Sequence, residues 1–180
     1  MIRIRIDDDL ELREIHQRDR KKIYDVVDEN RVFLKRWLPW LDYTKSPHSY
    51  LSVIKSWQQN IEMGTGMELG LFYHDEFIGM CGFTTIEPNS RRAQIGYWLT
   101  QEYEGRGLML KTVKGLTDYG FKEMGLNRIE IVCGEKNLRS RKLPEALGFT
   151  PEGTMKEYEF LYDHYHDCIL YRMLKSEWPY

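Results

Sequence analysis

The segment Ile95-Gly-Tyr-Trp-Leu-Thr-Gln-Glu-Tyr-Glu-Gly-Arg-Gly-Leu-Met109 is the most informative part of this chain. A strand pattern enters a loop that contains Gly105 and Gly107, and the loop opens directly into a long helical pattern. Glycine permits positive φ and close approach of a ligand to the backbone, and the first N–H groups of a helix have no intrahelical partner. Together with the positive end of the helix dipole, these groups favour a phosphate or pyrophosphate.

Two familiar phosphate-binding loops do not fit this segment. A Walker loop requires Gly-Lys-Ser/Thr, whereas Gly107 is followed by Leu108 and Met109. The dinucleotide fingerprint requires a third glycine at position 110, where this chain has leucine. A glycine-bearing turn between a strand and a helix can also be purely structural, so the loop alone leaves both interpretations open.

Hydrophobic periodicity on either side of this loop predicts seven strands and four helices. The helices are expected from Ile23 to a stop at Pro39, from the Ser46-Pro47 start to Ile61, from Gly105 to Gly125, and from an Asn137 cap to Gly148. The strands are expected at 10–15, 68–73, 77–86, 92–99, 128–133, 152–161 and 166–174. The order βααβββαβαββ indicates a mixed α/β chain rather than a doubly wound repeat.

Composition narrows the class of protein. The 180 residues predict a single domain, 1–180, and 26 basic against 28 acidic residues leave a charge of −2, which argues against direct binding of nucleic acid through phosphates. No stretch approaches the roughly 20 apolar residues of a membrane span, and the N-terminus lacks a secretory signal pattern. Three cysteines without a CxxC spacing favour reduced thiols in a cytoplasmic protein. His164, His166 and Cys168 share one strand face, but nothing completes a metal-ligand set, so no metal is expected.

Three ordered motifs resemble the GNAT superfamily of N-acetyltransferases, in particular its RimJ/RimL-like branch, which acetylates the N-termini of ribosomal proteins. The family loop Gln/Arg-x-x-Gly-x-Gly/Ala is similar to 104–109, although Glu104 and Met109 depart from it. The family's Asn-x-x-Ser…Gly-Phe element is similar to 137–149, and its terminal hairpin is similar to 159–171. With the Trp-Leu-Pro-Trp run at 37–40, the resemblance covers essentially the whole chain.

The resemblance implies an acetyltransferase fold: a mixed, mostly antiparallel, twisted sheet of about seven strands flanked by helices. It also implies acetyl-CoA as co-substrate, with Asn137 hydrogen-bonded to the pantetheine arm. The arm would pair with the strand edge of Tyr97, Trp98 and Leu99. The pyrophosphate would lie on the loop formed by Glu104, Gly105, Arg106, Gly107, Leu108 and Met109, where Glu104 would contribute only its backbone N–H. Arg106 and the cluster Arg139, Arg141 and Lys142 would meet the outer phosphates, or else form solvated helix surface.

The reaction implied by the resemblance is attack of a neutral amine on a thioester, which needs a base for the amine and a donor for the leaving sulfur. The branch points to Ser140 as that donor. For the base we choose Glu159, which alternates with Tyr158 and Phe160 and therefore faces away from them in a strand. Burial beside a cleft would raise the pKa of its carboxyl above about 4.3. Glu157 and Glu68 are the alternatives.

The expected acceptor is a protein N-terminal α-amine, such as that of a ribosomal protein. A small-molecule amine such as a polyamine, amino acid or aminoglycoside, and a non-catalytic acyl-CoA-binding module, remain alternatives. In this family the segment with Trp37, Trp40 and Tyr43 covers the acceptor site. Core packing is the competing role for these aromatics, and it is favoured for Trp37, which falls on the helical stripe. The same segment allows a homodimer or higher homo-oligomer.

Overall fold

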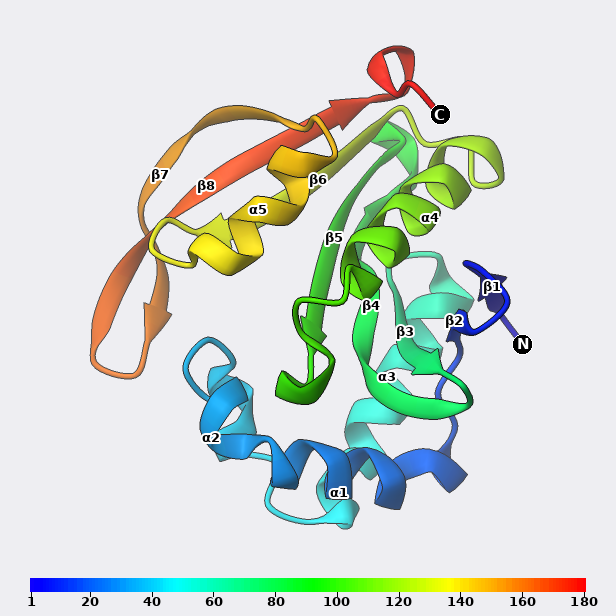
Figure 1. Cartoon of the computed structure of the whole chain (residues 1–180), viewed down its shortest axis with the longest axis vertical. Coiled ribbons are helices and arrows are strands. Elements are labelled where there is room, and N and C mark those ends of the chain that lie inside the picture. The colour runs from blue at the N-terminus through cyan, green and yellow to red at the C-terminus, as the bar shows by residue number, and fades with distance from the viewer.

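Alternating apolar residues build one eight-stranded sheet in the computed structural model, which describes residues 1–180, and helices cover both faces of the sheet (Figure 1). The strands are β1 (Arg3–Arg5), β2 (Leu10–Arg13), β3 (Met67–Tyr73), β4 (Glu76–Glu87), β5 (Arg92–Leu99), β6 (Arg128–Gly134), β7 (Thr150–Leu161) and β8 (His164–Leu174). The helices are α1 (Arg20–Glu29), α2 (Arg31–Leu34), α3 (Tyr50–Met63), α4 (Leu108–Lys122) and α5 (Leu138–Ala146).

The spatial order of the strands is β1-β2-β3-β4-β5-β6-β8-β7. All neighbours are antiparallel except β5 and β6, which α4 connects in parallel. The mixed, mostly antiparallel sheet is therefore confirmed. The strand beyond the expected seven is β1, which pairs with β2 over Arg3–Arg5, a segment too short to give a clear alternation.

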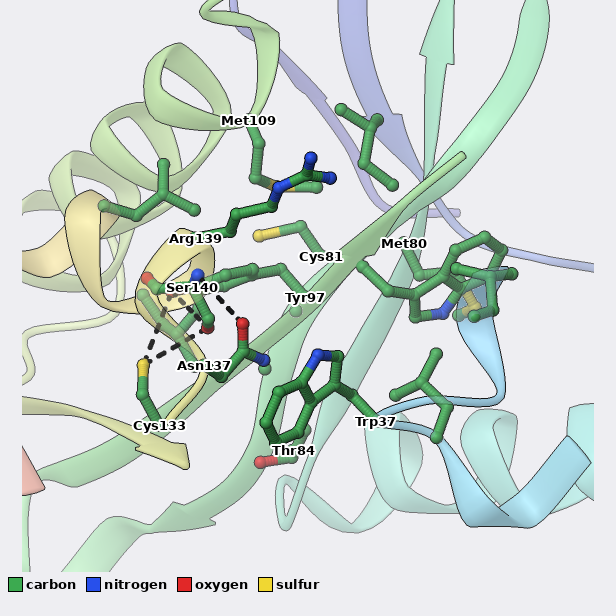
Figure 2. Close-up of a pocket in the computed structure, with 18 of the residues that line it drawn as sticks. Trp37, Met80, Cys81, Thr84, Tyr97, Met109, Cys133, Asn137, Arg139 and Ser140 are labelled. Carbon is green, nitrogen blue, oxygen red and sulfur yellow. Dashed lines mark hydrogen bonds between the residues drawn. The ribbon is translucent and has the colours of Figure 1, made fainter. Parts of the chain in front are cut away.

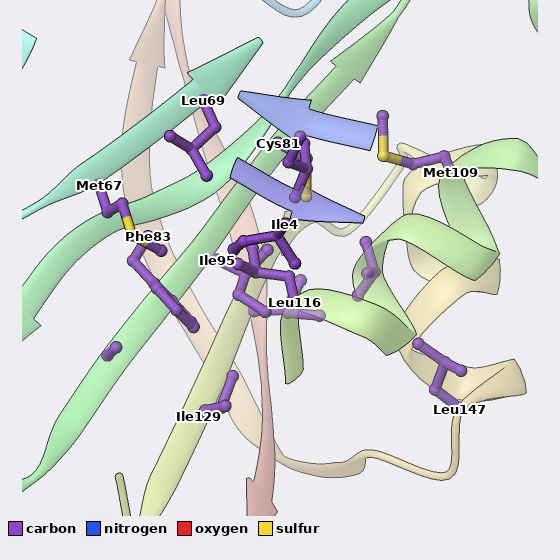
Figure 3. Close-up of a cluster of buried hydrophobic side chains, with 14 of the residues drawn as sticks. Ile4, Met67, Leu69, Cys81, Phe83, Ile95, Met109, Leu116, Ile129 and Leu147 are labelled. Carbon is purple, nitrogen blue, oxygen red and sulfur yellow. The ribbon is translucent and has the colours of Figure 1, made fainter. Parts of the chain in front are cut away.

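Each face of the sheet has its own hydrophobic core, because side chains alternate along each strand. Leu69 and Leu71 pack with Val113 and Leu116 of α4 on one face (Figure 3). Phe72, the next residue of β3, packs on the other face, where the helices α1 and α3 lie. This arrangement leaves α4 and α5 on one side of the functional region and α1 to α3 on the other.

The first helical stripe is not one continuous helix, contrary to the prediction. Asn30 has φ −103° and ψ 8°, and its side-chain Nδ2 donates to the Val26 carbonyl at 2.9 Å. This bond satisfies a terminal carbonyl of α1 and separates it from the one-turn helix α2, which ends at Leu34. Trp37 therefore lies in the turn after α2. None of the helices combines the length and the apolar character required to cross a membrane.

Candidate active site

A cavity of about 1480 Å³ opens where β5 and β6 separate (Figure 2). The two strands pair only from Arg92 to Ile95 of β5 and from Arg128 to Ile131 of β6. Beyond these residues β5 stays paired to β4 and β6 to β8, so the strands diverge (Figure 1). The edge of β5 that faces the gap therefore has no strand partner from Gly96 to Leu99 and is free to pair with an extended ligand.

The cavity brings together nearly all residues that the sequence analysis selected. Those that line it are Trp37, Trp40, Tyr43, Tyr97, Trp98, Leu99, Glu104, Gly105, Gly107, Leu108, Met109, Asn137, Ser140 and Glu159. Arg106 lies outside this set, and its guanidinium stacks 4.9 Å from the centre of the Tyr103 ring. Residues more than 120 positions apart in the chain thus meet at one site, although their individual roles stay predictions.

The glycine loop presents unpaired backbone N–H groups at the start of α4. Gly105 has φ +74° and Gly107 has φ +73°, and a Cβ at either residue would meet no atom within 4 Å. The backbone N–H groups from Gly105 to Leu110 donate no hydrogen bond within the chain. Because these donors lie at a helix N-terminus, they suit an anion, and the pyrophosphate contact stays a prediction. Leu110, which the motif did not single out, adds its N–H to the group.

Glu104 does not contribute the backbone N–H that was predicted for it. That N–H donates to the Gln101 carbonyl at 3.2 Å, because the residues before it form a tight turn. The Glu104 carboxylate instead forms an ion pair with the guanidinium of Arg139, reaching from the loop to α5. The pair neutralises a negative charge beside the anion site, which explains how the loop tolerates glutamate where the family has Gln or Arg.

The cationic cluster predicted for the outer phosphates is largely engaged elsewhere. Arg141 donates to the Tyr171 hydroxyl at 3.0 Å and to the Glu135 carbonyl at 2.9 Å, and its guanidinium also lies 3.4 Å from Glu145. These bonds attach α5 to β8 and remove Arg141 from the predicted phosphate contacts. Lys142, which is exposed at the cavity, forms no ion pair and is available for an outer phosphate.

Ser140 is the centre of a hydrogen-bond network at the start of α5 (Figure 2). Its backbone N–H donates to Asn137 Oδ1 at 3.2 Å, which confirms Asn137 as the helix cap. Its hydroxyl donates to the Tyr97 hydroxyl at 3.3 Å, and its Oγ lies 3.2 Å from Cys133 Sγ. Burial raises the pKa of the Tyr97 phenol and of the Cys133 thiol, so both groups keep their protons near neutral pH.

Glu159 lies on β7 opposite His166 of β8 and lines the cavity from the hairpin side. A bulge between Met155 and Glu159 changes the direction of β7, and Glu157 within it has φ +50°. The Glu159 side chain is half-buried, whereas Tyr158 is 56% exposed, as the alternation predicted. Burial raises the pKa of the Glu159 carboxyl, and no ion pair opposes this shift. Glu157 is exposed and does not line the cavity, which removes it as an alternative base.

The aromatic residues of the segment after α2 form one wall of the cavity. Trp37 is not part of the helical core, contrary to the prediction, because α2 ends before it. Its ring packs over Gly134, where a Cβ would come within 3.3 Å, and lies 6.2 Å from the His166 ring. Trp40 lies 6.4 Å from the Trp98 ring of β5, while Tyr43 is 83% exposed at the mouth.

One contact in the site carries no signal in the sequence, and one of the two alternative bases also lines the cavity. The hydroxyl of Tyr97 contacts Ser140, 43 residues away, and only the fold brings the two together. Glu68 of β3 lines the cavity from the side opposite the hairpin, together with Thr84 of β4. Nowhere do three or more His, Cys, Asp or Glu side chains gather in a geometry that could hold a metal ion.

The chain is similar to known acetyltransferases over its full length. A family model described as an acetyltransferase (GNAT) domain matches residues 9–150. The ribosomal-protein-serine acetyltransferase of Escherichia coli is 29% identical, over 97% of this chain and 98% of that protein. The ribosomal protein uS5-alanine N-acetyltransferase of Escherichia coli is 32% identical, over 95% of this chain and 90% of that protein. A solved structure of RimL, an acetyltransferase of ribosomal L7/L12 α-N-protein in complex with coenzyme A, superimposes with a TM-score of 0.92 at 27% identity, covering 96% of this chain and 98% of that one.

Proposed function

This chain belongs to the acetyltransferase (GNAT) domain family, and we propose that it acetylates the N-terminal α-amine of a protein. It is an N-acetyltransferase, and its acetyl donor is acetyl-CoA. The donor fits the residues present: unpaired N–H groups from Gly105 to Leu110 suit a pyrophosphate, and the unpaired edge of β5 suits the amide-bearing pantetheine arm. The relatives named as acetyltransferases of serine and alanine in ribosomal proteins support a ribosomal protein as the acceptor. They also support a cytoplasmic location for this enzyme.

The observation that carries the α-amine proposal is the single half-buried carboxylate at the hairpin side of the cavity, Glu159. An α-amine has a pKa near 7.7–8.0, so removing its proton at pH 7 costs about 1–1.4 kcal/mol, against about 4.6 kcal/mol for a lysine near 10.4. One carboxylate whose pKa is raised by burial alone is better matched to the smaller of these two costs. The aromatic wall from Trp37 to Tyr43 suits an extended chain end.

In the proposed reaction, Glu159 accepts a proton from the α-ammonium, directly or through one water. The neutral nitrogen then attacks the thioester carbonyl carbon and a C–N bond forms. The nitrogen releases its surplus proton to solvent, and the C–S bond breaks as the tetrahedral intermediate collapses. Ser140 turns its hydroxyl proton from Tyr97 to the departing sulfur and donates a hydrogen bond to it. The sulfur leaves as a thiolate and takes a proton from solvent. Asn137 holds Ser140 at the helix start, and its free Nδ2 group is placed to bind the pantetheine arm.

A competition experiment tests the acceptor. A peptide with a free N-terminal serine or alanine, its N-blocked counterpart that contains lysine, and spermidine are supplied together at equal concentrations with acetyl-CoA. Mass spectrometry should find the acetyl group on the free α-amine. Preference for the blocked peptide or for spermidine would contradict the α-amine proposal and favour a lysine or polyamine acceptor.

A further inference from the structure

One carboxyl group in the cavity has no role in the mechanism above. Glu68 lies between Met67 and Leu69 on β3, and both of those neighbours pack into the core under α4. Because side chains alternate along a strand, Glu68 points to the opposite face of the sheet, where α3 lies and the cavity opens.

Glu68 pays a desolvation cost that no cation of this chain offsets. Its Oε2 atom is buried and has no hydrogen-bond partner. Burial raises the pKa of the carboxyl, and its own backbone N–H and the neighbouring Asn60 amide oppose only part of that rise. No Lys, Arg or His side chain forms an ion pair with it. Buried carboxyl oxygens are nearly always paired, so a carboxyl group that lines a cavity and has an unpartnered buried oxygen suits a positively charged ligand.

The surroundings of Glu68 suit a positively charged group. Trp57 of α3 lines the cavity one turn before Asn60, so both side chains lie on the helix face that is turned to the sheet. A carboxylate and an aromatic ring that line the same part of a cavity bind cations through both charge and cation–π attraction.

The sheet register separates Glu68 from the predicted reaction centre. Glu68 pairs with Gly82 of β4, and Gly82 pairs with Gly96 of β5, so Glu68 lies two strands, roughly 10 Å, from β5. Glu159 lies on β7, at the far side of the gap between β5 and β6. The two carboxylates therefore line the cavity from opposite sides of the free β5 edge.

We propose that Glu68 forms a subsite for a second positive charge on the acceptor, carried by a lysine or arginine side chain close to the acetylated N-terminus. This inference rests on the proposed function and narrows its substrate class to peptides with a basic residue among the first few positions. The α-amine would be presented to Glu159 while the basic side chain reaches across the cavity floor to Glu68.

The experiment compares the wild-type enzyme with Glu68→Gln on matched peptides. One set carries a free N-terminal serine and a single lysine at the second, third or fourth position, and the other has norleucine in its place. The substitution should raise KM for the best lysine peptide by roughly 10- to 100-fold, as expected for loss of a charge-assisted hydrogen bond. The KM for its norleucine partner and the kcat for both should stay within about twofold. Glu62→Gln, on the exposed surface of α3, is the matched control and should change neither constant.

Other outcomes overturn this assignment. An equal loss of kcat on both peptides would make Glu68 the base, and unchanged constants on both would remove it from acceptor binding. If acetyl-CoA stabilises the wild type but neither peptide is acetylated, the proposed acceptor is wrong. The cation subsite is then tested separately, by measuring thermal unfolding with spermidine alone. Spermidine should then raise the melting temperature of the wild type and not that of Glu68→Gln, whereas equal shifts would contradict a cation subsite.

Discussion

The hydroxyl of Tyr97 donates a hydrogen bond to the Ser140 carbonyl oxygen at 2.9 Å and accepts one from the Ser140 hydroxyl at 3.3 Å. This double contact joins β5, beside its open edge, to the first turn of α5. The Tyr97 hydroxyl proton is donated to the Ser140 carbonyl, and burial raises the pKa of the phenol, so Tyr97 is a hydrogen-bonding partner that holds its proton. The orientation of the Ser140 hydroxyl therefore depends on a residue that the sequence motif assigned to backbone contacts alone.

We expect Tyr97→Phe to lower kcat by about tenfold, the effect of one lost hydrogen bond, with acetyl-CoA affinity unchanged. Ser140→Ala should lower kcat by roughly 10- to 1000-fold, the usual range for one acid or electrostatic donor. Since Tyr97 acts through Ser140, the double variant should be no slower than Ser140→Ala alone. Steady-state kinetics on all three variants measure the coupling. Tyr158→Phe, on the exposed side of β7, is the control, and additive losses would contradict the positioning role of Tyr97.

The anion site at the start of α4 predicts a selective effect of Gly107→Val. Both Gly107 and Gly125, beyond the two ends of α4, adopt positive φ, near +73° and +67°. Valine at either position should destabilise the fold by about 1–3 kcal/mol through backbone strain. Only Gly107→Val should abolish stabilisation by acetyl-CoA, which for the wild type is about 2.7 kcal/mol at a hundredfold excess over Kd.

Thermal unfolding with and without acetyl-CoA measures both effects. Gly125→Val is the control for strain, because a Cβ there meets no atom and the residue does not line the cavity. If acetyl-CoA still raised the melting temperature of Gly107→Val but not that of Gly125→Val, the cofactor would bind elsewhere.

The raised pKa of Glu159 predicts a characteristic pH–rate profile. The wild-type kcat/KM should fall as the pH drops through that raised value, because a protonated carboxyl cannot accept the amine proton. Glu159→Gln should be most deficient between that pH and the α-amine pKa of about 7.7–8.0, and should approach the wild type above it, where the amine is already neutral. Rates followed by thiol release across this range test the profile. A deficit that does not depend on pH would point to a positioning role.

The raised pKa values of Glu159 and Glu68 also predict how the free energy of unfolding changes with pH. The folded-state pKa values of Glu159 and Glu68 lie above their ordinary value, so the unfolded chain loses these protons first as the pH rises. Their contribution to the free energy of unfolding is therefore lost on going from acidic to neutral pH. Glu159→Gln and Glu68→Gln should stabilise the protein at neutral pH and have little effect below the ordinary glutamate pKa. Urea unfolding at both pH values measures this, and Glu62→Gln should stay within about 0.5 kcal/mol throughout. Destabilisation of either variant at neutral pH would show that its carboxylate is paired in the native state.

Much of the fold could be predicted because the deciding signals are local. Apolar alternation identified seven of eight strands, and the glycine loop predicted both the positive φ values and the start of a helix. The misjudged elements depend on individual contacts. Asn30 ends α1 because its side chain bonds back to the Val26 carbonyl, and β1 forms by pairing with β2. Periodicity does not register such contacts, since each involves one residue and a specific neighbour.

Local sequence was sufficient for the family, the α/β fold and the cofactor loop, because these follow from spacing and backbone conformation within short segments. Only the tertiary structure could show that Glu104 is neutralised by Arg139, that Arg141 is engaged by Tyr171, and that Tyr97 is hydrogen-bonded to Ser140. It also placed Glu68 and Glu159 on opposite sides of one cavity. The physical reason is that a charge or hydrogen bond depends on distances of a few ångströms between residues that are far apart in the chain, and those distances exist only once the sheet has formed.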